Sequence, residues 1–350
     1  MLAAESKAVG AAAVPVLPLE PVPSWRQVVE PVEPFLRAVA ERLAEQVEEF
    51  EPEIAAYARY ALTNQGKQLR PALVALSAES TGGVNDNLVK VATIIEIVHL
   101  ATLVHDDVMD EAQIRRRRPT LAAHCGNTIS VLVGDCLFAH ALQLAASFPT
   151  PDICRAVASA TKTVCSGEIL QTQRQRQFQL SRGEYFRVLK MKTAELFALS
   201  CELGAWLSGS TANERAALRG YGMALGTAYQ VYDDCLDVFG SEDMAGKSLG
   251  TDLTSGKLTL PLIVALERAD APTRGEIERM VAHWKVGQLP RLLALLDQFE
   301  AREESSQVIH GFCGDAARAL TVLPASDGRG ALTALAGFLA QQTDKLGVSA

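Results

Sequence analysis

The sequence predicts an all-α protein. Of its 350 residues, 48% are hydrophobic and only 6% are aromatic, with Ala and Leu prominent, and this composition favours helices over sheets. Apolar residues recur at helical spacing near the N-terminus, as at Phe35, Leu36, Val39 and Leu43. In addition, two apolar runs typical of helices each end in a group of aspartates. A helical fold with chemistry at the helix ends is therefore expected.

The chain divides into a short tail and one domain. Residues 1–24 are rich in Ala, Val and Pro and are expected to form a loose tail, because their prolines cannot continue a helix. A signal peptide is not expected, since Glu5 precedes a weakly apolar stretch that prolines soon interrupt. No apolar run approaches the roughly 20 residues that span a bilayer. Residues 25–350 are expected to form a single helical domain.

The helices can be placed in order from their periodicity. The first is expected from Trp25 to about Ala61, and Pro71 suits the first turn of the second. Asp152 is expected to cap a later helix. Gly220, Gly222 and Gly226 would let a neighbouring helix approach closely. The remaining helices are expected at 88–109, 128–148, 152–171, 184–207 and 216–238, with polar segments at 171–179 and 240–257 and further helices from 262 to 350.

Charge and cysteine usage limit the possible partners and location. The formal net charge of −8 disfavours general affinity for nucleic acid or anionic membranes. The seven cysteines are scattered without CxxC spacing, and an odd count fits a reducing cytoplasm better than a disulfide framework. We therefore expect a cytoplasmic protein that does not bind nucleic acid.

The two aspartate groups indicate a divalent metal site. Asp106 and Asp110 are four residues apart, so on a helix they share one face and repel each other. Asp233 and Asp237 repeat the pattern. If the two groups face each other, they form an oxygen-lined cage, and Mg²⁺ held by carboxylates leaves coordination sites for water and phosphate oxygens.

Basic residues near these groups could bind phosphate. Arginine offers planar, two-pronged contacts to phosphate oxygens. Each group also has a structural reading: a solvated turn for Lys67 and Arg70, a surface ion-pair patch for the arginines, or an apolar stem for Lys192. No catalytic nucleophile, zinc spacing, Rossmann motif or P-loop is present. The pattern favours electrostatic withdrawal of a phosphate leaving group beside an apolar cavity that shields the resulting cation. The candidate phosphate ligands are Lys67, Arg70, Arg115, Arg116, Lys192 and Lys247.

The order and spacing of these motifs resemble the trans-type polyprenyl diphosphate synthases, in particular long-chain synthases of the octaprenyl kind. The resemblance is strong from Gln65 to Pro261 and weaker beyond. It is carried by Gly66-Lys67-Gln68-Leu69-Arg70-Pro71, His99, Asp106-Asp107-Val108-Met109-Asp110, Arg115-Arg116, Gly134-Asp135, Gly167-Glu168, Lys192-Thr193, Tyr229-Gln230, Asp233-Asp234-Cys235-Leu236-Asp237, Gly246-Lys247 and Gly256-Lys257.

The resemblance implies a fold, a reaction and a set of site residues. The fold would be an isoprenoid synthase-type bundle of antiparallel helices around a deep central cavity, usually a homodimer. The enzyme would use Mg²⁺ to ionise an allylic diphosphate of the farnesyl or geranyl type, and isopentenyl diphosphate would attack the cation. The implied metal ligands are Asp106, Asp110 and Asp233. Asp107, Asp234 and Asp237 would support them, and Asp237 is also expected to bind metal.

The resemblance also divides the basic residues between two substrates. Arg115, Lys192 and Lys247 would hold the allylic diphosphate, whereas Lys67, Arg70, His99 and Arg116 would hold isopentenyl diphosphate. Thr193 and Gln230 would lie beside the cation, and Lys257 would bind substrate. Three positions depart from the family pattern: Gln65 stands for a glycine, Gln68 for an arginine and Arg117 for a glycine. If the last position needs a positive φ, Arg117 is strained there.

Small residues upstream of the first aspartates predict a long product. Ala101 and Thr102 precede Asp106 by five and four residues, about 6–7.5 Å along a helix. Short-chain members often carry a bulky aromatic there, so the resemblance implies a product of C35 or longer. The sequence leaves open whether that product is released through transient membrane contact. Leu137, Phe138 and Ala141 are candidates for the tunnel floor.

Two other functions remain open on the sequence alone. The first is a non-catalytic partner subunit of a heteromeric synthase, which the intact aspartates disfavour. The second is a terpene cyclase of the same fold. The aspartate-rich second motif and the presumed second diphosphate site of Lys67, Arg70 and His99 disfavour cyclisation.

Overall fold

The computed structural model describes residues 24–63, 66–240 and 249–347. Helices dominate this part of the chain, as predicted, and one two-stranded ribbon is present. Of the expected tail at 1–24, only Ser24 is described, and it caps the first helix. The elements are α1 (Trp25–Val29), η1 (Glu30–Val32), α2 (Glu33–Glu45), η2 (Gln46–Glu49), α3 (Pro52–Leu62), α4 (Leu69–Glu79), α5 (Asp86–Met109), β1 (Ile114–Arg115), β2 (Arg118–Pro119), α6 (Leu121–Cys125), α7 (Asn127–Ala146), α8 (Asp152–Gln173), α9 (Arg182–Leu189), η3 (Lys190–Ala194), α10 (Glu195–Leu207), α11 (Ala212–Phe239), α13 (Thr251–Ser255), α14 (Leu260–Arg268), α15 (Ala271–Ala282), η4 (Val286–Gln288), α16 (Leu289–Gln298), α17 (Ala301–Ala319), η5 (Leu320–Val322) and α18 (Asp327–Thr343).

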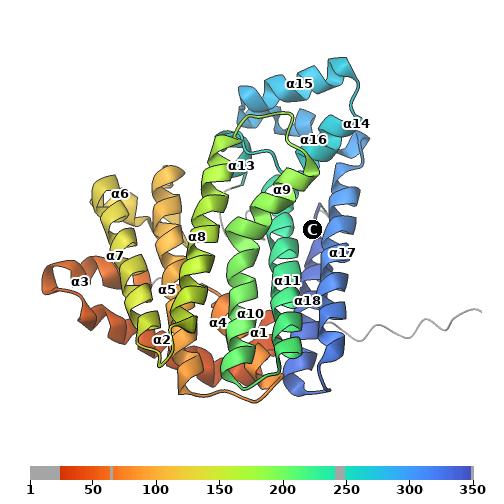
Figure 1. Cartoon of the computed structure of the whole chain (residues 1–350). Coiled ribbons are helices and arrows are strands. Elements are labelled where there is room, and N and C mark those ends of the chain that lie inside the picture. The colour runs from red at the N-terminus through yellow and green to blue at the C-terminus, as the bar shows by residue number, and fades with distance from the viewer. Residues whose placement is uncertain (1–23, 64–65, 241–248, 348–350) are drawn as a thin grey trace, which may run out of the picture.

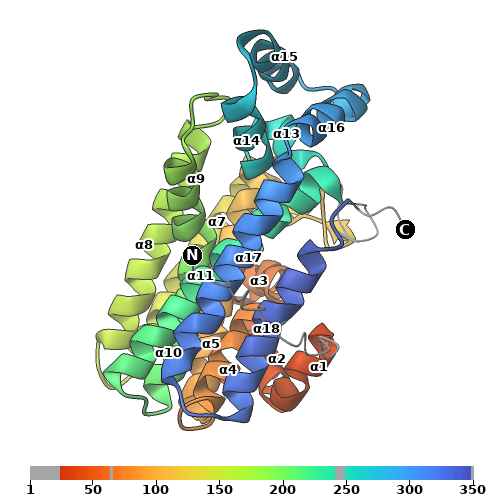
Figure 2. The same cartoon turned by 90° about the vertical axis from the view of Figure 1, so that its right-hand side faces the viewer.

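The long helices lie side by side in one bundle, with α13 to α16 at one end (Figures 1 and 2). Helices that follow one another along the chain pack together, from α4 and α5 through α7, α8 and α10 to α11. Short connections between them require neighbouring helices to run in opposite directions. Helix α10 packs against α4, α5, α8 and α11, and α17 and α18 close the bundle against α11 and α4. The antiparallel arrangement agrees with the sequence expectation.

Prolines make the N-terminal helix shorter than predicted. The single helix expected from Trp25 to Ala61 is wrong, because the chain forms α1, η1, α2, η2 and α3 over that range. Pro31, Pro34 and Pro52 each lie in the first turn of a new element, where the missing N–H would be unpaired in any case. Pro71 lies in the first turn of α4, as predicted. Asp152 does not cap α8: Pro151 is the N-cap, and Asp152 is the first helical residue.

Two of the three glycines singled out on α11 allow close helix packing. An added Cβ at Gly222 would lie 2.5 Å from the Phe197 carbonyl oxygen, and one at Gly226 would lie 2.7 Å from the Ala194 Cα. The same atom at Gly220 would meet nothing within 4 Å. Of these three glycines, Gly222 and Gly226 are the ones at which the η3–α10 segment approaches the α11 backbone closely.

Two helices are more apolar than the sequence reading allowed. By length and composition, α5 and α7 are long and apolar enough to cross a membrane. Most of the apolar window of α5 is buried in the bundle, as in a core helix, whereas only 39% of that of α7 is buried. Val131 and Leu132 of α7 are exposed. Helix α7 thus presents an apolar strip on the outside of the bundle.

Candidate active site

The first aspartate group lies at the C-terminal end of α5. Asp107 is buried, and its carboxylate accepts a hydrogen bond from Arg115 Nε at 2.6 Å. Asp106 is half-buried and Asp110 is exposed. Burial raises the pKa of Asp106 to about 6; Lys192 opposes this rise, and Glu168 and Asp110 add to it. The carboxylates are therefore crowded, as their spacing predicted.

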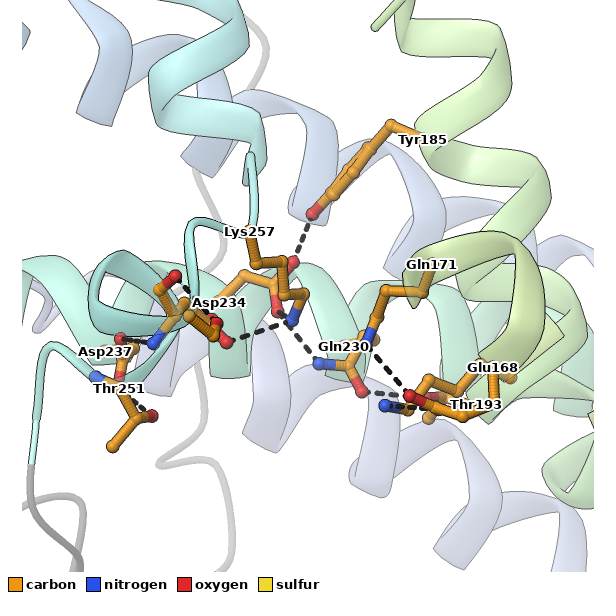
Figure 3. A network of polar contacts seen from close by, with 12 residues as sticks. Glu168, Gln171, Tyr185, Thr193, Gln230, Asp234, Asp237, Thr251 and Lys257 are labelled. Carbon is orange, nitrogen blue, oxygen red and sulfur yellow. Dashed lines mark hydrogen bonds and ion pairs between the residues drawn. The ribbon is translucent and has the colours of Figure 1, made fainter. Parts of the chain in front are cut away.

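The second aspartate group lies at the end of α11, and its aspartates differ in burial and in hydrogen bonding. Asp234 is fully buried, and its oxygens accept hydrogen bonds from Tyr185 Oη at 2.7 Å, Gln230 Nε2 at 2.9 Å and Lys257 Nζ at 2.9 Å (Figure 3). Asp233 remains half-buried. The group thus joins α11 to α9 and to the segment after α13.

Asp237, a predicted metal ligand, binds the backbone at the start of α13. Its two carboxylate oxygens accept hydrogen bonds from the backbone N–H groups of Thr251 and Asp252, at 3.3 and 3.1 Å, and from Thr251 Oγ1 at 3.1 Å. The side chain is buried. Asp237 therefore holds the start of α13, as the labelled residues in Figure 3 show, and its role as a metal ligand stays a prediction.

A π-helical turn carries Lys192 and Thr193, whose side chains contact Glu168 and Gln230. The stretch Lys190–Ala194 forms a π-helix between α9 and α10, a distortion frequent at functional sites. Thr193 Oγ1 donates to Gln230 Oε1 at 2.7 Å, which links this turn to Asp234 through Gln230. Lys192 Nζ lies 2.5 Å from Glu168 Oε2 on α8. Because Lys192 and Glu168 both act on Asp106, the network connects the two aspartate groups.

Lys257, a predicted substrate ligand, is paired with two aspartates in this structure. Its ammonium lies 2.9 Å from Asp234 and 3.2 Å from Asp252, and its side chain is 15% exposed. Burial raises the pKa of Asp252 to about 7; Lys257 opposes the rise, and the aspartates of the second group add to it. The sequence reading did not identify Asp252 as part of the site, and its position in a polar loop gave no helical pattern to indicate it.

Arg115 to Arg118 lie in a short β-hairpin. Strands β1 and β2 pair Ile114 with Pro119 and Arg115 with Arg118. Arg116 and Arg117 form the two-residue turn with φ of 51° and 63°, the combination of a type I′ turn. Arg117 therefore has the positive φ under which the sequence analysis expected strain.

The base of this hairpin is fixed to α3 and α6. The Arg118 guanidinium lies 4.1 Å from the centre of the Tyr60 ring and donates to the Tyr60 carbonyl. Tyr60 Oη donates to the Pro119 carbonyl at 2.7 Å, and the ring stacks on His124 with centroids 5.3 Å apart. The anchoring residues Tyr60, Arg118 and His124 were not predicted, because the contacts join segments far apart in the sequence.

A second group of cations gathers between α4, α5 and the hairpin. An added Cβ at Gly66 would lie 2.6 Å from Arg116 Nη2, so the Arg116 guanidinium rests against that glycine. Burial lowers the pKa of His99 well below its usual range, and Arg70, Arg116 and Arg115 lower it further. The structure therefore brings Arg70, Arg116 and His99 together, as predicted, and the lowered pKa favours a neutral His99 imidazole. Lys67 is exposed, and Lys247 lies outside the described residues.

The small residues proposed to set product length lie inside the bundle. Ala101 is fully buried, and Thr102 donates to the His99 carbonyl at 2.6 Å. Leu137 and Ala141 of α7 are also fully buried, and α7 packs against α5. Phe138 lies 5.5 Å from the His105 ring, centre to centre.

The carboxylates fit a metal that is completed by substrate. Within the described ranges, no three His, Cys, Asp or Glu side chains are gathered closely enough to enclose a metal alone. Mg²⁺ typically takes one or two carboxylates together with substrate phosphate oxygens, so a full protein cage is not required. Burial first, and then the nearby Glu168 and Asp110 carboxylates, raise the pKa of Asp106, so a cation bound there would stabilise the ionised carboxylate. Asp106, Asp110 and Asp233 are the donors suited to Mg²⁺.

A helical bundle with two aspartate-ended helices beside separate groups of basic side chains has the architecture of the all-α isoprenoid synthases. The family model for polyprenyl synthetase matches residues 51–295. The chain belongs to the polyprenyl synthetase family, a family of prenyl-transferring enzymes.

Individual relatives agree with this assignment. The octaprenyl diphosphate synthase of Haemophilus influenzae is 33% identical over 87% of this chain and 93% of its own length. Component 2 of the heptaprenyl diphosphate synthase of Geobacillus stearothermophilus is 33% identical over 88% of this chain and 95% of its own. The crystal structure of a Caulobacter crescentus polyprenyl synthase, complexed with calcium and isoprenyl diphosphate, is 34% identical with a TM-score of 0.85, covering 92% of this chain and 98% of that one.

Proposed function

We propose that this enzyme condenses isopentenyl diphosphate head-to-tail onto an allylic diphosphate to make a long-chain all-trans polyprenyl diphosphate. One observation carries the proposal: Lys192 and the Arg70–Arg116 pair belong to two different networks of side chains. Lys192 lies in the network of the carboxylates, whereas Arg70 and Arg116 gather beside a neutral His99. Two cation groups suit two diphosphate substrates.

The first group of residues would promote departure of the allylic diphosphate. Asp106, Asp110 and Asp233 would hold Mg²⁺, which when bound neutralises the charge of the leaving diphosphate. Arg115 and Lys192 would hold the same diphosphate, with Lys247 as a further expected ligand outside the described residues. Because Lys192 is paired with Glu168, substrate binding must draw its ammonium away from that carboxylate.

The second group would hold the attacking substrate. Arg70 and Arg116, with the exposed Lys67, would bind the diphosphate of isopentenyl diphosphate, and His99 would contribute a neutral imidazole. Thr193 and Gln230 share a hydrogen bond and would place their dipoles beside the allylic cation. The departing pyrophosphate would accept the final proton. These residues supply position and charge, since no nucleophile of the protein is required.

The decisive experiment incubates the purified protein with labelled isopentenyl diphosphate, farnesyl diphosphate and Mg²⁺. We expect label in products of C35 or longer, and no label in them when a chelator removes the metal. A cyclase would instead turn over an allylic diphosphate alone. Absence of Mg²⁺-dependent elongation with geranyl, farnesyl and geranylgeranyl primers would exclude catalysis by this chain alone and favour a partner subunit.

The product length is proposed to depend on Ala101. Replacing this fully buried alanine with phenylalanine should block the path of the growing chain and shorten the main product by several isoprene units. Chromatography of the labelled products measures this, and a matched change at the exposed Ala325 should leave the product unchanged. An Ala101→Phe variant that folds and still makes the long product would contradict the assignment of the tunnel.

The protein is proposed to act as a cytoplasmic homodimer, with transient membrane contact for product release and no nucleic-acid partner. The exposed Val131 and Leu132 of α7 support a covered face, and the seven free cysteines fit a reducing compartment. Sedimentation of the purified chain tests the dimer. A monomer that elongates only after a second protein is added would instead indicate a two-component synthase.

A further inference from the structure

A buried acid lies behind the second cation group. Glu96 is on α5, three residues before His99, and is 2% exposed. Its Oε2 has no hydrogen-bond partner, and the buried Nε of Arg70 has none either. A buried carboxylate is costly unless opposite charges compensate it. Core packing alone therefore does not explain why a glutamate occupies this buried position.

Two arginines supply the compensating charge. The guanidiniums of Arg70 and Arg116 both act on the Glu96 carboxylate from within electrostatic range. Each guanidinium also contacts a second residue. Arg70 lies 5.2 Å from the centre of the Phe197 ring, and Arg116 rests against Gly66. The two arginines repel one another, and Glu96 attracts both. They converge around one carboxylate although they come from α4 and from the β1–β2 turn.

We infer that Glu96 is a positioning residue that holds Arg70 and Arg116 together for the diphosphate of isopentenyl diphosphate. The inference rests on the proposed function. Glu96 is too deeply buried to contact that substrate itself, so its effect must pass through the arginines. With Glu96 present, the pair carries a net charge of about +1 before Lys67 is counted, which lowers the repulsion that would separate the guanidiniums. The residue should therefore affect one substrate and not the other.

The test is the Glu96→Gln variant, which keeps the shape and removes the charge. We expect the KM for isopentenyl diphosphate to rise tenfold or more, while kcat and the KM for the allylic substrate change less than threefold. Calorimetric titration of isopentenyl diphosphate into the protein should show the same loss of affinity. Glu202→Gln removes a glutamate that lies 2.8 Å from Arg219 elsewhere in the bundle, and it should change neither constant.

A double-mutant cycle separates positioning from simple loss of packing. If Glu96 acts through Arg116, adding Glu96→Gln to an Arg116→Gln variant should raise KM by less than threefold. Glu96→Asp, which keeps the charge, should recover part of the affinity and serves if the glutamine variant does not fold. An unchanged or lower KM in Glu96→Gln, or fully additive effects, overturns the inference. Failure of the wild-type chain to elongate would instead overturn the proposed function, and the titration still reports on Glu96.

Discussion

Asp106 is the residue at which stability and function oppose each other most directly. Its carboxyl is half-buried beside Glu168 and Asp110, and burial raises its pKa to about 6. A carboxyl whose pKa is higher in the folded than in the unfolded protein opposes folding once it is ionised. In the metal-free protein this cost is full above pH 6, decreases as the pH falls toward 3.8, and vanishes below.

Asp106→Asn should therefore stabilise the metal-free protein while abolishing elongation. The free energy of unfolding should rise by on the order of 1–3 kcal/mol at pH 7.5, since one pKa unit corresponds to about 1.4 kcal/mol. Thermal unfolding in chelator, repeated at pH 7.5 and pH 4, measures the gain and its disappearance. An asparagine variant no more stable than the wild type at pH 7.5 would show that Asp106 is not under strain.

Arg117 carries a different cost, in its backbone. A non-glycine residue in the left-handed region costs about 1–2 kcal/mol, whereas glycine adopts it freely but loses about 0.5–1 kcal/mol in chain entropy. With φ at 63°, Arg117→Gly should change the stability by less than about 1 kcal/mol and keep activity. Arg117→Val should unfold at a lower temperature than Arg117→Gly. Equal melting temperatures for the two variants would contradict the strained turn.

At the scale of the elements, the π-helical turn packs closely against Gly167 of the neighbouring helix α8. An added Cβ at Gly167 would lie 2.7 Å from the backbone nitrogen of Lys192 and 2.9 Å from the Met191 Cβ. Helix α8 can therefore approach this turn only where it lacks a side chain. The approach also brings Glu168, the next residue, to its contact with Lys192.

Gly167→Ala should push α8 away from the turn. Overpacking of this kind costs about 1–3 kcal/mol and should displace Lys192, so both the melting temperature and kcat should fall. Gly220→Ala is the matched control, because nothing lies within 4 Å of its added Cβ. The control should be stabilised by about 0.5–1 kcal/mol through helix propensity. Equal effects of the two substitutions would show that Gly167 has no special contact.

The sequence predicted elements with strong periodicity and missed those set by distant contacts. The ends of α5 and α11 were found because aspartates interrupt clear apolar runs, and the motifs around Lys192 and Gln230 do converge. The breaks in the first helix at Pro31, Pro34 and Pro52 were not predicted, because only the apolar pattern was used there. The π-turn at Lys190–Ala194 was not predicted from the sequence. Glu96 was visible as a charge in an apolar run, but its partners are on other elements.

At the scale of the whole molecule, the last helix ties the chain end to its centre. Helix α18 packs against α17, α4 and α11. Tyr221 of α11 is fully buried, and its hydroxyl donates to the Leu332 carbonyl of α18 at 2.7 Å. This bond joins the helix that carries the second aspartate group to a segment beyond the family match at residue 295.

Tyr221→Phe should loosen this attachment. It removes one of the hydrogen bonds that the Leu332 carbonyl accepts within α18, which costs about 0.5–1.5 kcal/mol. The melting temperature should fall while the substrate KM values stay unchanged, because the bond lies away from the cation groups. Tyr57→Phe, at a half-exposed tyrosine, should have little effect. A Tyr221→Phe variant with wild-type stability would show that α18 is held by packing alone.

The crowded carboxylates also bear on how such a sequence could change over generations. A copy released from catalysis would gain stability from replacing Asp106, so drift and selection for folding would both act to remove it. The chain instead keeps Asp106, Asp107 and Asp110 together with Asp233, Asp234 and Asp237. A lineage in which this protein had become a passive scaffold would be expected to show losses there first.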